Sequence, residues 1–508
     1  MRPPFVMGID LGTEGCKVAI YGLDGELVIE RAKSYPIYRP RIDWAEQDPM
    51  DWWRAVVECL REVLRKIRAE DVEAVSITSQ REAFVPLDVE GNILTRSIIW
   101  LDRRTLRQAS MVKMKLTTAR ILEITGLPIE HIYSALRLLW LKEEMPHVFN
   151  RIHKILFCKD FIAYKLTGEM ATDYSMASRT MLLDIRKMEW SEELCEDMGI
   201  PISILPQLMN SCDVVGEVTA EASSATGLRK GIPVIIGGGD RPCEALGAGA
   251  IAEGYINIGT GTGTCFEVPL KEPRPDPKAR FPMCIHVVPR TWEYEITVNA
   301  TGGSLRWFRD VFCEKEVEEA SRKGKSPYEL MVSMATKISP GADGLFYYPY
   351  LWGARAPKFN PMAKGVFIGI THGHTKAHFI RAILEGIALQ YAEVFEILEE
   401  MKVEVRRITM TGGEARSELW NIIKASVLRR EIAVPRIIAA TSLGAAILAA
   451  IGAKLHSSIE KATEEMVHIA KVYKPDPALS KVYQEIYKRY REIYSILEGS
   501  FRLLNPLT

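Results

Sequence analysis

The chain has 508 residues, of which 47% are hydrophobic, and its 65 basic and 65 acidic side chains give a formal net charge of zero. This length is enough for about two to four domains, and the balanced charge gives no reason to expect a nucleic acid or an acidic partner. The nine cysteines contain no C-x-x-C pair, which is typical of reduced cytoplasmic thiols. The N-terminus lacks the apolar segment of a secretory signal, and the stretch 443–453 is too short to cross a bilayer. We therefore expect a cytoplasmic protein without a membrane or nucleic-acid partner.

The first motif is an apolar segment, 6–11, that ends beside a glycine-rich turn. Ile9 and Asp10 alternate, so they are predicted to point to opposite faces of a strand. Gly12 and Gly15 open a turn before a second predicted strand at 18–21. Amides and hydroxyls in such a turn can bind phosphate, and a carboxylate at the strand end can hold magnesium, directly or through water. An ordinary hairpin with a surface aspartate accounts for these residues equally well.

A helix and a strand are predicted next. Asp48 as N-cap and Pro49 at the first position begin a helix that is expected to run to about residue 68. Its buried face is predicted to consist of Trp53, Val56, Val57, Leu60 and Leu64. The Trp52–Trp53 pair on this helix is interpreted as core rather than as a sugar platform. A strand at 72–77 follows and ends in the polar cluster 78–82.

The strand-to-glycine pattern returns later in the chain. The stretch 234–240, after a mainly helical region at 103–200, indicates a buried strand that runs into three glycines and Asp240. The segment 254–264 again indicates a strand, a Gly/Thr turn and a strand, and 407–413 is a third junction, followed by a helix from Arg416 or Ser417. The recurrence indicates a weak internal duplication with a boundary near 245–253.

Several common motifs are absent or incomplete. The chain has no G-x-x-x-x-G-K-[ST], and G-x-G-x-x-G fails because Thr264 stands where a third glycine would follow Gly259 and Gly261. His372, His374 and His378 have metal-ligand types but lie in a Gly/Thr connector without carboxylate or cysteine partners, so metal binding there is disfavoured.

Taken together, the junctions resemble those of the FGGY carbohydrate kinases, a family of the actin and hexokinase ATPase superfamily. The resemblance covers nearly the whole chain. Two stretches match family signatures: 133–144, with Arg137 where lysine is usual, and 365–370 with 378–386. The runs Trp-Ala-Glu-Gln-Asp-Pro at 44–49 and Gly-Gly-Glu-Ala-Arg-Ser at 412–417 are also similar to family stretches.

The resemblance implies an α/β fold with two ribonuclease-H-like domains and ATP in a catalytic cleft between them. Residues 1–249 are expected to bind the sugar and to carry the catalytic base, and residues 250–508 to bind the nucleotide. By position, Asp10 is expected to bind Mg²⁺ with Asp240, and Asp240 to be the base. The implied nucleotide-binding residues are Thr13, Lys17, Gly259, Thr260, Gly302, Arg306, Gly413 and Ser417.

Asp240 also has a physical case of its own. Phosphoryl transfer needs an in-line hydroxyl, neutralised phosphate charge and a carboxylate that takes the hydroxyl proton. A carboxylate after a glycine-rich strand is rigidly placed, and the glycines let a substrate approach the backbone. The alternative is that Asp240 only caps the helix that follows it.

The acceptor site is implied at Gln80, Arg81, Glu82, Tyr133, Asp240 and Arg241. Gln-Arg-Glu at 80–82 resembles the glycerol kinase version, in which a guanidinium and a carboxylate suit a vicinal diol. The Gly-Gly-Gly-Asp run, the Gly-Ala-Arg-Ala-Pro run at 353–357 and the run at 412–417 are more similar to xylulokinases. Ile132 departs from glycerol kinases, where tyrosine contacts substrate, and neighbouring Tyr133 is the candidate substitute. Arg241, where similar enzymes carry Asn or Gln, either binds an extra hydroxyl or acidic group or pairs with Glu244.

We therefore expect an ATP- and Mg²⁺-dependent kinase that acts on a primary hydroxyl of a small sugar, with a ketopentose such as xylulose first. Glycerol or another polyol is the alternative acceptor. A non-catalytic, actin-like ATPase switch is the remoter alternative, because a fold does not determine a function. A homodimer is possible.

Overall fold

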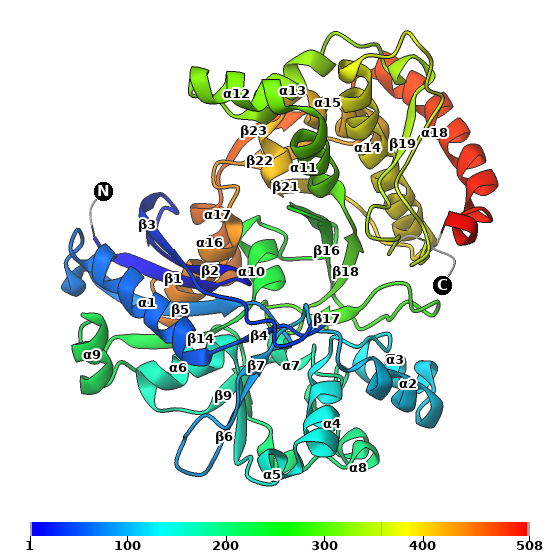
Figure 1. Cartoon of the computed structure of the whole chain (residues 1–508). Helices are drawn as coiled ribbons and strands as arrows, with labels where there is room; N and C mark the ends of the chain where they lie inside the picture. Colours follow the sequence, from blue (N-terminus) through cyan, green and yellow to red (C-terminus); the bar gives the residue numbers. More distant parts are fainter. Residues whose placement is uncertain (1–2, 357, 505–508) are drawn as a thin grey trace. The chain divides into compact units, whose positions relative to one another are not determined.

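The structure is a computed structural model that describes residues 3–356 and 358–504, so Pro357 of the Gly-Ala-Arg-Ala-Pro run lies outside the described residues. The chain forms two compact units (Figure 1). Unit 1 comprises the described residues up to Ala252, together with Pro269–Tyr294 and Ala439–His468; unit 2 comprises Glu253–Val268, Glu295–Ile438 and the described residues from Ile469 on. Two late segments thus belong with the first unit, whereas the predicted domains divide the chain once, at 249/250.

The main sheet of unit 1 has the strand order β13-β14-β5-β1-β2-β3. β1 runs antiparallel to β2 and parallel to β5, and β14 runs parallel to β5. The carboxyl ends of β1, β5 and β14 therefore meet at one edge of the sheet. The strands are β1 (Phe5–Leu11), β2 (Gly15–Gly22), β3 (Leu27–Ser34), β5 (Val72–Ser79), β13 (Val214–Glu217) and β14 (Pro233–Gly239).

The alternation predicted for the first strand is confirmed. Met7 and Ile9 are fully buried in a core that includes residues of α1 (Pro49–Leu64) and α6 (Cys158–Thr167). The other face of β1 packs against α16 (Ala440–Gly452). Gly8 is needed there, since a Cβ would lie 2.2 Å from the Ser442 carbonyl oxygen. Asp10 shares this face with Gly8, because successive side chains of a strand alternate.

The first helix differs in part from its prediction. Asp48 accepts a hydrogen bond from Met50 N and Pro49 begins the helix, as expected, but α1 ends at Leu64 rather than near 68. The fully buried face is centred on Trp52, Val56 and Leu60. Trp53 and Leu64 are only partly buried against the core, so the predicted face was wrong by about one residue at its start. Tryptophans stand at both 52 and 53, and only packing chooses between them.

Helices cover both faces of this sheet (Figure 1). α1 packs on β2 and β3, and α6 packs on β14 and β5; α10 and α16 pack together on the opposite side. The remaining helices of unit 1 are α2 (Leu106–Lys115), α3 (Thr118–Thr125), α4 (Ser134–Glu144), α5 (Pro146–Phe149), α7 (Tyr174–Ala177), α8 (Glu192–Met198), α9 (Ala220–Thr226), α10 (Asp240–Gly247) and α17 (Ile459–Met466). Short strand pairs are β4 (Glu46–Gln47) with β7 (Ser97–Ile98), β6 (Phe84–Leu87) with β8 (Lys154–Phe157), β9 (Ala171–Asp173) with β12 (Gln207–Met209), and β10 (Leu183–Asp184) with β11 (Glu189–Trp190).

The second large sheet has the order β17-β18-β16-β15-β21-β22-β23. Its strands are β15 (Tyr255–Thr260), β16 (Thr264–Leu270), β17 (Met283–Ile285), β18 (Trp292–Val298), β21 (Arg407–Gly412), β22 (Ile432–Pro435) and β23 (Ile469–Tyr473). The helices of unit 2 are α11 (Thr301–Phe312), α12 (Glu314–Lys323), α13 (Pro327–Ala335), α14 (Lys376–Glu400), α15 (Glu418–Leu428) and α18 (Pro477–Glu498), with a short pair β19 (Phe346–Tyr348) and β20 (Val366–Ile368).

The two sheets repeat one arrangement. β15 forms an antiparallel hairpin with β16 through a Gly/Thr turn and lies parallel to β21, which lies parallel to β22. β1, β2, β5 and β14 follow the same scheme. This repeat is the predicted duplication, and the two-domain α/β fold of the ribonuclease-H-like class is confirmed.

Candidate active site

The unit 1 site lies at the carboxyl edge of β1, β5 and β14. Asp10 is in register with Thr78, and Gly239 with Ser79. The residues that follow these strands therefore lie close together. They include the predicted cluster 80–82 and Asp240, the first residue of α10.

Asp10 carries a perturbed carboxyl group. It pairs in register with Lys17 on β2, and its side chain is half-buried. Burial and, next, the negative charge of Asp240 raise the pKa of Asp10 to about 7, against an opposing effect of Lys17. Lys17 also lies 3.5 Å from a carboxylate oxygen of Glu30. Two carboxylates that destabilise each other's charge form a place where a cation is stabilised.

The turn after β1 is held by side chains from elsewhere in unit 1. Gly12 N donates to Gly15 O at 3.0 Å, and Tyr35 donates to the Gly12 carbonyl. The Thr13 carbonyl accepts from Gln47 Nε2 at 2.7 Å, and the Thr13 hydroxyl accepts from Trp100 Nε1 at 2.9 Å. The turn is therefore held by one internal hydrogen bond and by three side chains from elsewhere in unit 1.

The three residues of the cluster 80–82 are buried, and each contacts a different part of unit 1. Gln80 donates from Nε2 to Gln47 Oε1 at 2.7 Å, while its own buried Oε1 has no partner among the described residues. Arg81 Nε lies 3.3 Å from Asp240 Oδ1. The cluster thus presents one acceptor oxygen and one guanidinium beside Asp240.

Glu82 is held by an arginine that the sequence did not single out. Arg179 donates from Nε to Glu82 Oε1 at 2.6 Å, and its Nη2 forms an ion pair with the same oxygen at 2.6 Å. Glu82 has a backbone φ of 66°, in the left-handed region that a non-glycine residue adopts at some cost. Tyr133 is buried behind this pair, with the Arg179 guanidinium 5.1 Å from its ring centre.

Asp240 remains accessible, with a side chain that is 35% exposed. The N-cap of α10 is Gly239 and not Asp240. Asp240 Oδ1 accepts a hydrogen bond from Arg241 N at 2.9 Å. Arg241 Nη1 lies 2.9 Å from Glu244 Oε2, so the anticipated Arg241–Glu244 pair is present. A partly exposed carboxylate next to a guanidinium can bind and deprotonate a hydroxyl.

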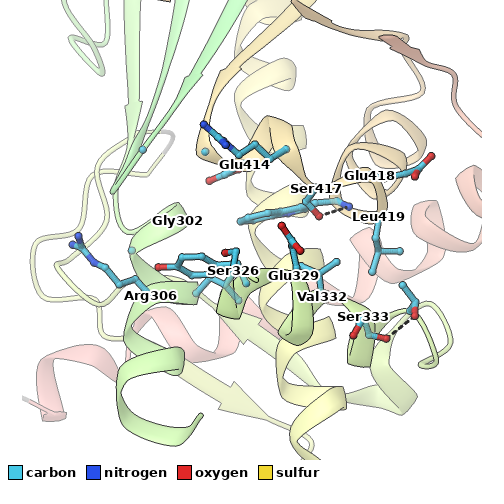
Figure 2. A pocket seen from close by; sticks show the side chains of 18 of the residues that line it. Gly302, Arg306, Ser326, Glu329, Val332, Ser333, Glu414, Ser417, Glu418 and Leu419 are labelled. Atoms are coloured by element: carbon cyan, nitrogen blue, oxygen red, sulfur yellow. Dashed lines mark hydrogen bonds between the residues drawn. The ribbon is translucent and has the colours of Figure 1, made fainter. Parts of the chain in front are cut away.

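Unit 2 contains a cavity of about 940 Å³ (Figure 2). This is within the volume range of small-molecule and cofactor sites. Four predicted nucleotide-binding residues line it: Gly302, Arg306, Gly413 and Ser417. Ser417 at the start of α15 and Glu329 of α13 point toward one another across the cavity (Figure 2).

Glycines permit the close packing around this cavity. A Cβ on Gly302 would lie 2.3 Å from the Gly261 carbonyl oxygen, whereas a Cβ on Gly413 would meet no atom within 4 Å. Gly302 thus lets the start of α11 approach the turn after β15, and Gly413 leaves open space. Ser417 is the N-cap of α15 and accepts from Trp420 N at 3.3 Å. The helix thus begins at Glu418, one or two residues after its predicted start at Arg416 or Ser417.

Gly259 and Thr260 are the last two residues of β15, directly before the Gly/Thr turn. The Thr260 hydroxyl donates to Thr411 O at 2.5 Å and accepts from Glu414 N at 3.1 Å, so it is used inside the fold. Gly261 and Thr262, which follow, line the cavity. Glu414 also lines the cavity. Its carboxylate oxygen Oε2 accepts hydrogen bonds from the buried Lys424 and from the Tyr391 hydroxyl.

The chain matches known proteins over both units. The profile of the FGGY family of carbohydrate kinases, N-terminal domain, matches residues 5–247, and that of the C-terminal domain matches residues 256–453. The chain belongs to the FGGY family of carbohydrate kinases. It is 30% identical to a gluconokinase and 30% identical to a xylulose kinase, both of Bacillus subtilis; 98% and 97% of this chain are covered, and 97% of each relative. A xylulose kinase structure from Rhodospirillum rubrum has a TM-score of 0.89 at 28% identity, over 98% of this chain and all of that chain.

Three residues around the candidate site of this FGGY kinase were not identified from the sequence as site residues. Gln47 links Thr13 to Gln80, Trp100 contacts Thr13, and Arg179 holds Glu82. Gln47 lies in a run that carries the family resemblance, which was the only signal for it. Nothing near Arg179 or Trp100 in the sequence indicates their partners.

Asp10 and Asp240 are the candidate ligands of a divalent cation in this kinase. Within residues 3–356 and 358–504, no group of three or more His, Cys, Asp and Glu side chains is arranged to hold a metal. Asp10 and Asp240 supply two hard oxygen ligands, which fits Mg²⁺, because this ion is usually held by one or two carboxylates together with phosphate oxygens and water. His378 instead lies 3.1 Å from an Asp343 carboxylate oxygen, and His374 accepts from Thr371 N. No helix in the described part of the chain has both the length and the hydropathy to cross a membrane.

Proposed function

We propose that this FGGY kinase transfers the terminal phosphoryl group of ATP to a primary hydroxyl of a small sugar, with a ketopentose such as xylulose as the first candidate. The observation that carries the proposal is the accessible Asp240 carboxylate 3.3 Å from Arg81 Nε, at the edge where β1, β5 and β14 end. The 30% identity to a xylulose kinase over almost the full length of both chains supports this choice of sugar.

Asp240 accepts the proton of the attacking hydroxyl in this proposal. Arg81 orients the carboxylate and donates to a neighbouring sugar oxygen, and the unpartnered Gln80 Oε1 accepts from a sugar hydroxyl. Glu82, kept in place by Arg179, accepts from a second hydroxyl, and Tyr133 supports the arginine from behind. Deprotonation as the oxygen–phosphorus bond forms provides a nucleophile without a free alkoxide.

The nucleotide is assigned to residues of both units. The cavity of unit 2 receives the adenosine at Gly413 and Ser417, and Gly302 and Arg306 contact the nucleotide on the side of α11. Thr13 and Lys17 of unit 1 contact the terminal phosphates, and the β15 turn region with Gly259 and Thr260 supplies further contacts. Because the Thr260 hydroxyl is engaged within the fold, its contact is assigned to the backbone.

Mg²⁺ is assigned to Asp10 and Asp240. The ion neutralises phosphate charge when it is bound. Burial and the negative charge of Asp240 raise the pKa of Asp10 to about 7. A bound cation opposes both effects, so it favours the ionised form of Asp10.

A sugar acid is the second candidate acceptor. Arg241 follows Asp240, and its side chain is 35% exposed despite the ion pair with Glu244. A guanidinium at this position can bind a carboxylate. The Bacillus subtilis gluconokinase is as similar to this chain as the xylulose kinase is.

A coupled assay of ADP formation with xylulose, ribulose, glycerol and gluconate tests the proposal. We expect the highest kcat/KM for a ketopentose. A preference for gluconate that the Arg241→Gln substitution removes would establish the second candidate, and a preference for glycerol would establish the polyol alternative. ATP hydrolysis that no sugar or polyol changes would contradict kinase activity and favour an ATPase switch. Light scattering tests whether the protein forms a homodimer. Fractionation tests the cytoplasmic location.

A further inference from the structure

A buried ionic network lies directly behind the strand ends of unit 1. Lys159, at the start of α6, is fully buried, as are Asp160 and Asp173. Lys159 Nζ lies 2.6 Å from Asp160 Oδ1, 3.0 Å from Asp173 Oδ1 and 3.2 Å from the Ile236 carbonyl oxygen. Burial alone lowers the pKa of Lys159, but attraction to the two carboxylates outweighs it and raises the pKa above its ordinary value. The lysine is therefore a permanent donor.

The network continues to the main chain that carries Asp240. Asp173 Oδ2 accepts from the Ser175 hydroxyl at 2.5 Å and from the Ser211 hydroxyl at 2.8 Å. The Ser175 hydroxyl oxygen in turn accepts from Gly239 N at 2.9 Å. Gly239 immediately precedes Asp240, so the last amide before the candidate base is held by a side chain and not only by the sheet.

The same lysine also reaches the other half of the acceptor site. The Lys159 amide donates to the Ser79 hydroxyl oxygen at 3.1 Å, and this hydroxyl donates to the Gln80 carbonyl at 2.8 Å. One residue thus connects the end of β5, which carries the cluster 80–82, to the end of β14, which carries Asp240.

The ladder between β14 and β5 is irregular just before the carboxyl end of β14. The pairing of β14 with β5 is irregular between Ile235 and Gly238, and Gly237 has a φ of 70°. A Cβ on Gly238 would lie 2.3 Å from Val287 Cγ1, and a Cβ on Gly239 would lie 2.4 Å from Arg81 Cδ. The segment therefore has no side chains of its own to anchor it, and its ladder with β5 resumes only at Gly238 and Gly239, where Ser175 adds a contact from outside the sheet.

We propose that Lys159, Asp173 and Ser175 are positioning residues that set the location of the Asp240 carboxylate relative to Arg81 and the bound sugar. This inference rests on the proposed function. Buried ion pairs are costly to form and give little net stability, so a role in fixing geometry accounts for their presence better than stability does. A displacement of about 1 Å in such a group is sufficient to slow a reaction by about 100-fold.

Ser175→Ala tests the proposal, with Ser178→Ala as its matched control. Both serines are buried at α7, and each hydroxyl accepts from one amide and donates to one oxygen. Ser175 binds Gly239 N, whereas Ser178 binds Ile285 N at 3.1 Å and its hydroxyl donates to Ser175 O at 3.0 Å. Each deletion therefore leaves one buried amide without its acceptor, and the two differ in whether that amide is the one before Asp240. Ser175→Ala also removes a donor from the Asp173 carboxylate, so it is expected to cost more stability. Lys159→Met is less informative, because it leaves two buried carboxylates without a cation.

We expect Ser175→Ala to lower kcat for the best sugar by between about 10- and 100-fold, with KM for ATP within about threefold of wild type. Ser178→Ala is expected to keep kcat within about threefold although it lowers Tm, because it also leaves a buried amide without its acceptor. In an Asp240→Asn background, Ser175→Ala is expected to have no further effect on the residual rate, because the positioned group is gone.

Equal kcat values for the two serine variants would overturn the inference, as would a Ser175→Ala effect of the same size in the Asp240→Asn background. These outcomes are distinct from a failure of the proposed function, in which the wild-type protein itself phosphorylates no sugar in the panel.

Discussion

Arg179 donates a hydrogen bond of 2.6 Å from Nε to Glu82 Oε1, and its Nη2 lies 2.6 Å from the same oxygen, although the two residues are 97 positions apart in the chain. Both side chains are buried, and Glu82 adopts a left-handed backbone conformation. The pair therefore fixes the orientation of a carboxylate that is proposed to accept a sugar hydroxyl.

Arg179→Lys is expected to raise KM for the sugar by about 10-fold or more, with a smaller change in KM for ATP. Lysine keeps the positive charge but cannot donate two hydrogen bonds in a planar arrangement, so Glu82 loses its fixed orientation. Steady-state kinetics with each substrate varied separately measure this effect. Equal increases of the two KM values would contradict a specific role of Glu82 in sugar binding.

Asp240→Asn is expected to lower kcat by about 10²- to 10⁴-fold, which is the usual contribution of a general base. Asparagine has nearly the same shape and can still accept from Arg81, so nucleotide binding is expected to be retained. Rapid-quench kinetics and calorimetric titration with a non-hydrolysable ATP analogue measure the two properties. Glu244→Gln, which removes a nearby carboxylate of α10, is the control for a general change of charge. Normal turnover by the asparagine variant would exclude the proposed role.

Asp10→Asn is expected to stabilise the metal-free protein, and to do so more at pH 8 than at pH 5. The folded state raises the pKa of Asp10 from an ordinary 3.8 to about 7, through burial first and Asp240 second. Between these values the folded state binds more protons than the unfolded state, so this group makes the wild-type protein less stable as the pH rises from about 4 to 7. The full shift would exceed 4 kcal/mol, but the side chain is partly solvated, so roughly 2 kcal/mol at pH 8 is expected.

Thermal unfolding in a chelator at pH 5 and pH 8 measures this difference, and Lys17→Met provides the opposite change of local charge. The same Asp10→Asn protein is expected to lose Mg²⁺-dependent turnover. A decrease of Tm at pH 8 would show that the Asp10 charge is not destabilising in the folded state.

Gly302→Ala is expected to destabilise unit 2 by about 1–3 kcal/mol, the usual cost of overpacking, and to weaken nucleotide binding. Its Cβ would lie 2.3 Å from the Gly261 carbonyl oxygen, so either α11 or the β15 turn has to move. Gly413→Ala adds the same methyl group to the same cavity at a position where no atom lies within 4 Å, and is expected to leave Tm within about 1 °C. Equal Tm values for the two variants would show that the close approach at Gly302 has no energetic consequence.

Much of the strand-to-turn architecture could be predicted because its signals are local. Alternation placed Ile9 in the core and Asp10 on the opposite face, and the glycines at the ends of β14 and β21 marked where these strands stop, just before Asp240 and Gly413. The N-cap Asp48 was equally readable, because a capping side chain binds an amide only two or three residues away.

The buried face of α1 shows where local information was insufficient. Tryptophans at 52 and 53 and valines at 56 and 57 fit two neighbouring helical faces almost equally, and contact with β2 and β3 selected Trp52 and Val56. The inclusion of residues 439–468 in unit 1 is of the same kind, since α16 belongs there through its packing on β1 and β5.

The amino-acid sequence by itself determined the repeated strand–turn units, the positions of their carboxylates and the membership of a kinase family, because periodicity, glycines and motif order are properties of short segments. Only the tertiary structure decided that Arg179 binds Glu82, that Gln47 joins Thr13 to Gln80, and that the Thr260 hydroxyl is used inside the fold. Such partners are distant in the chain, and their meeting depends on how strands and helices pack, which no short segment encodes.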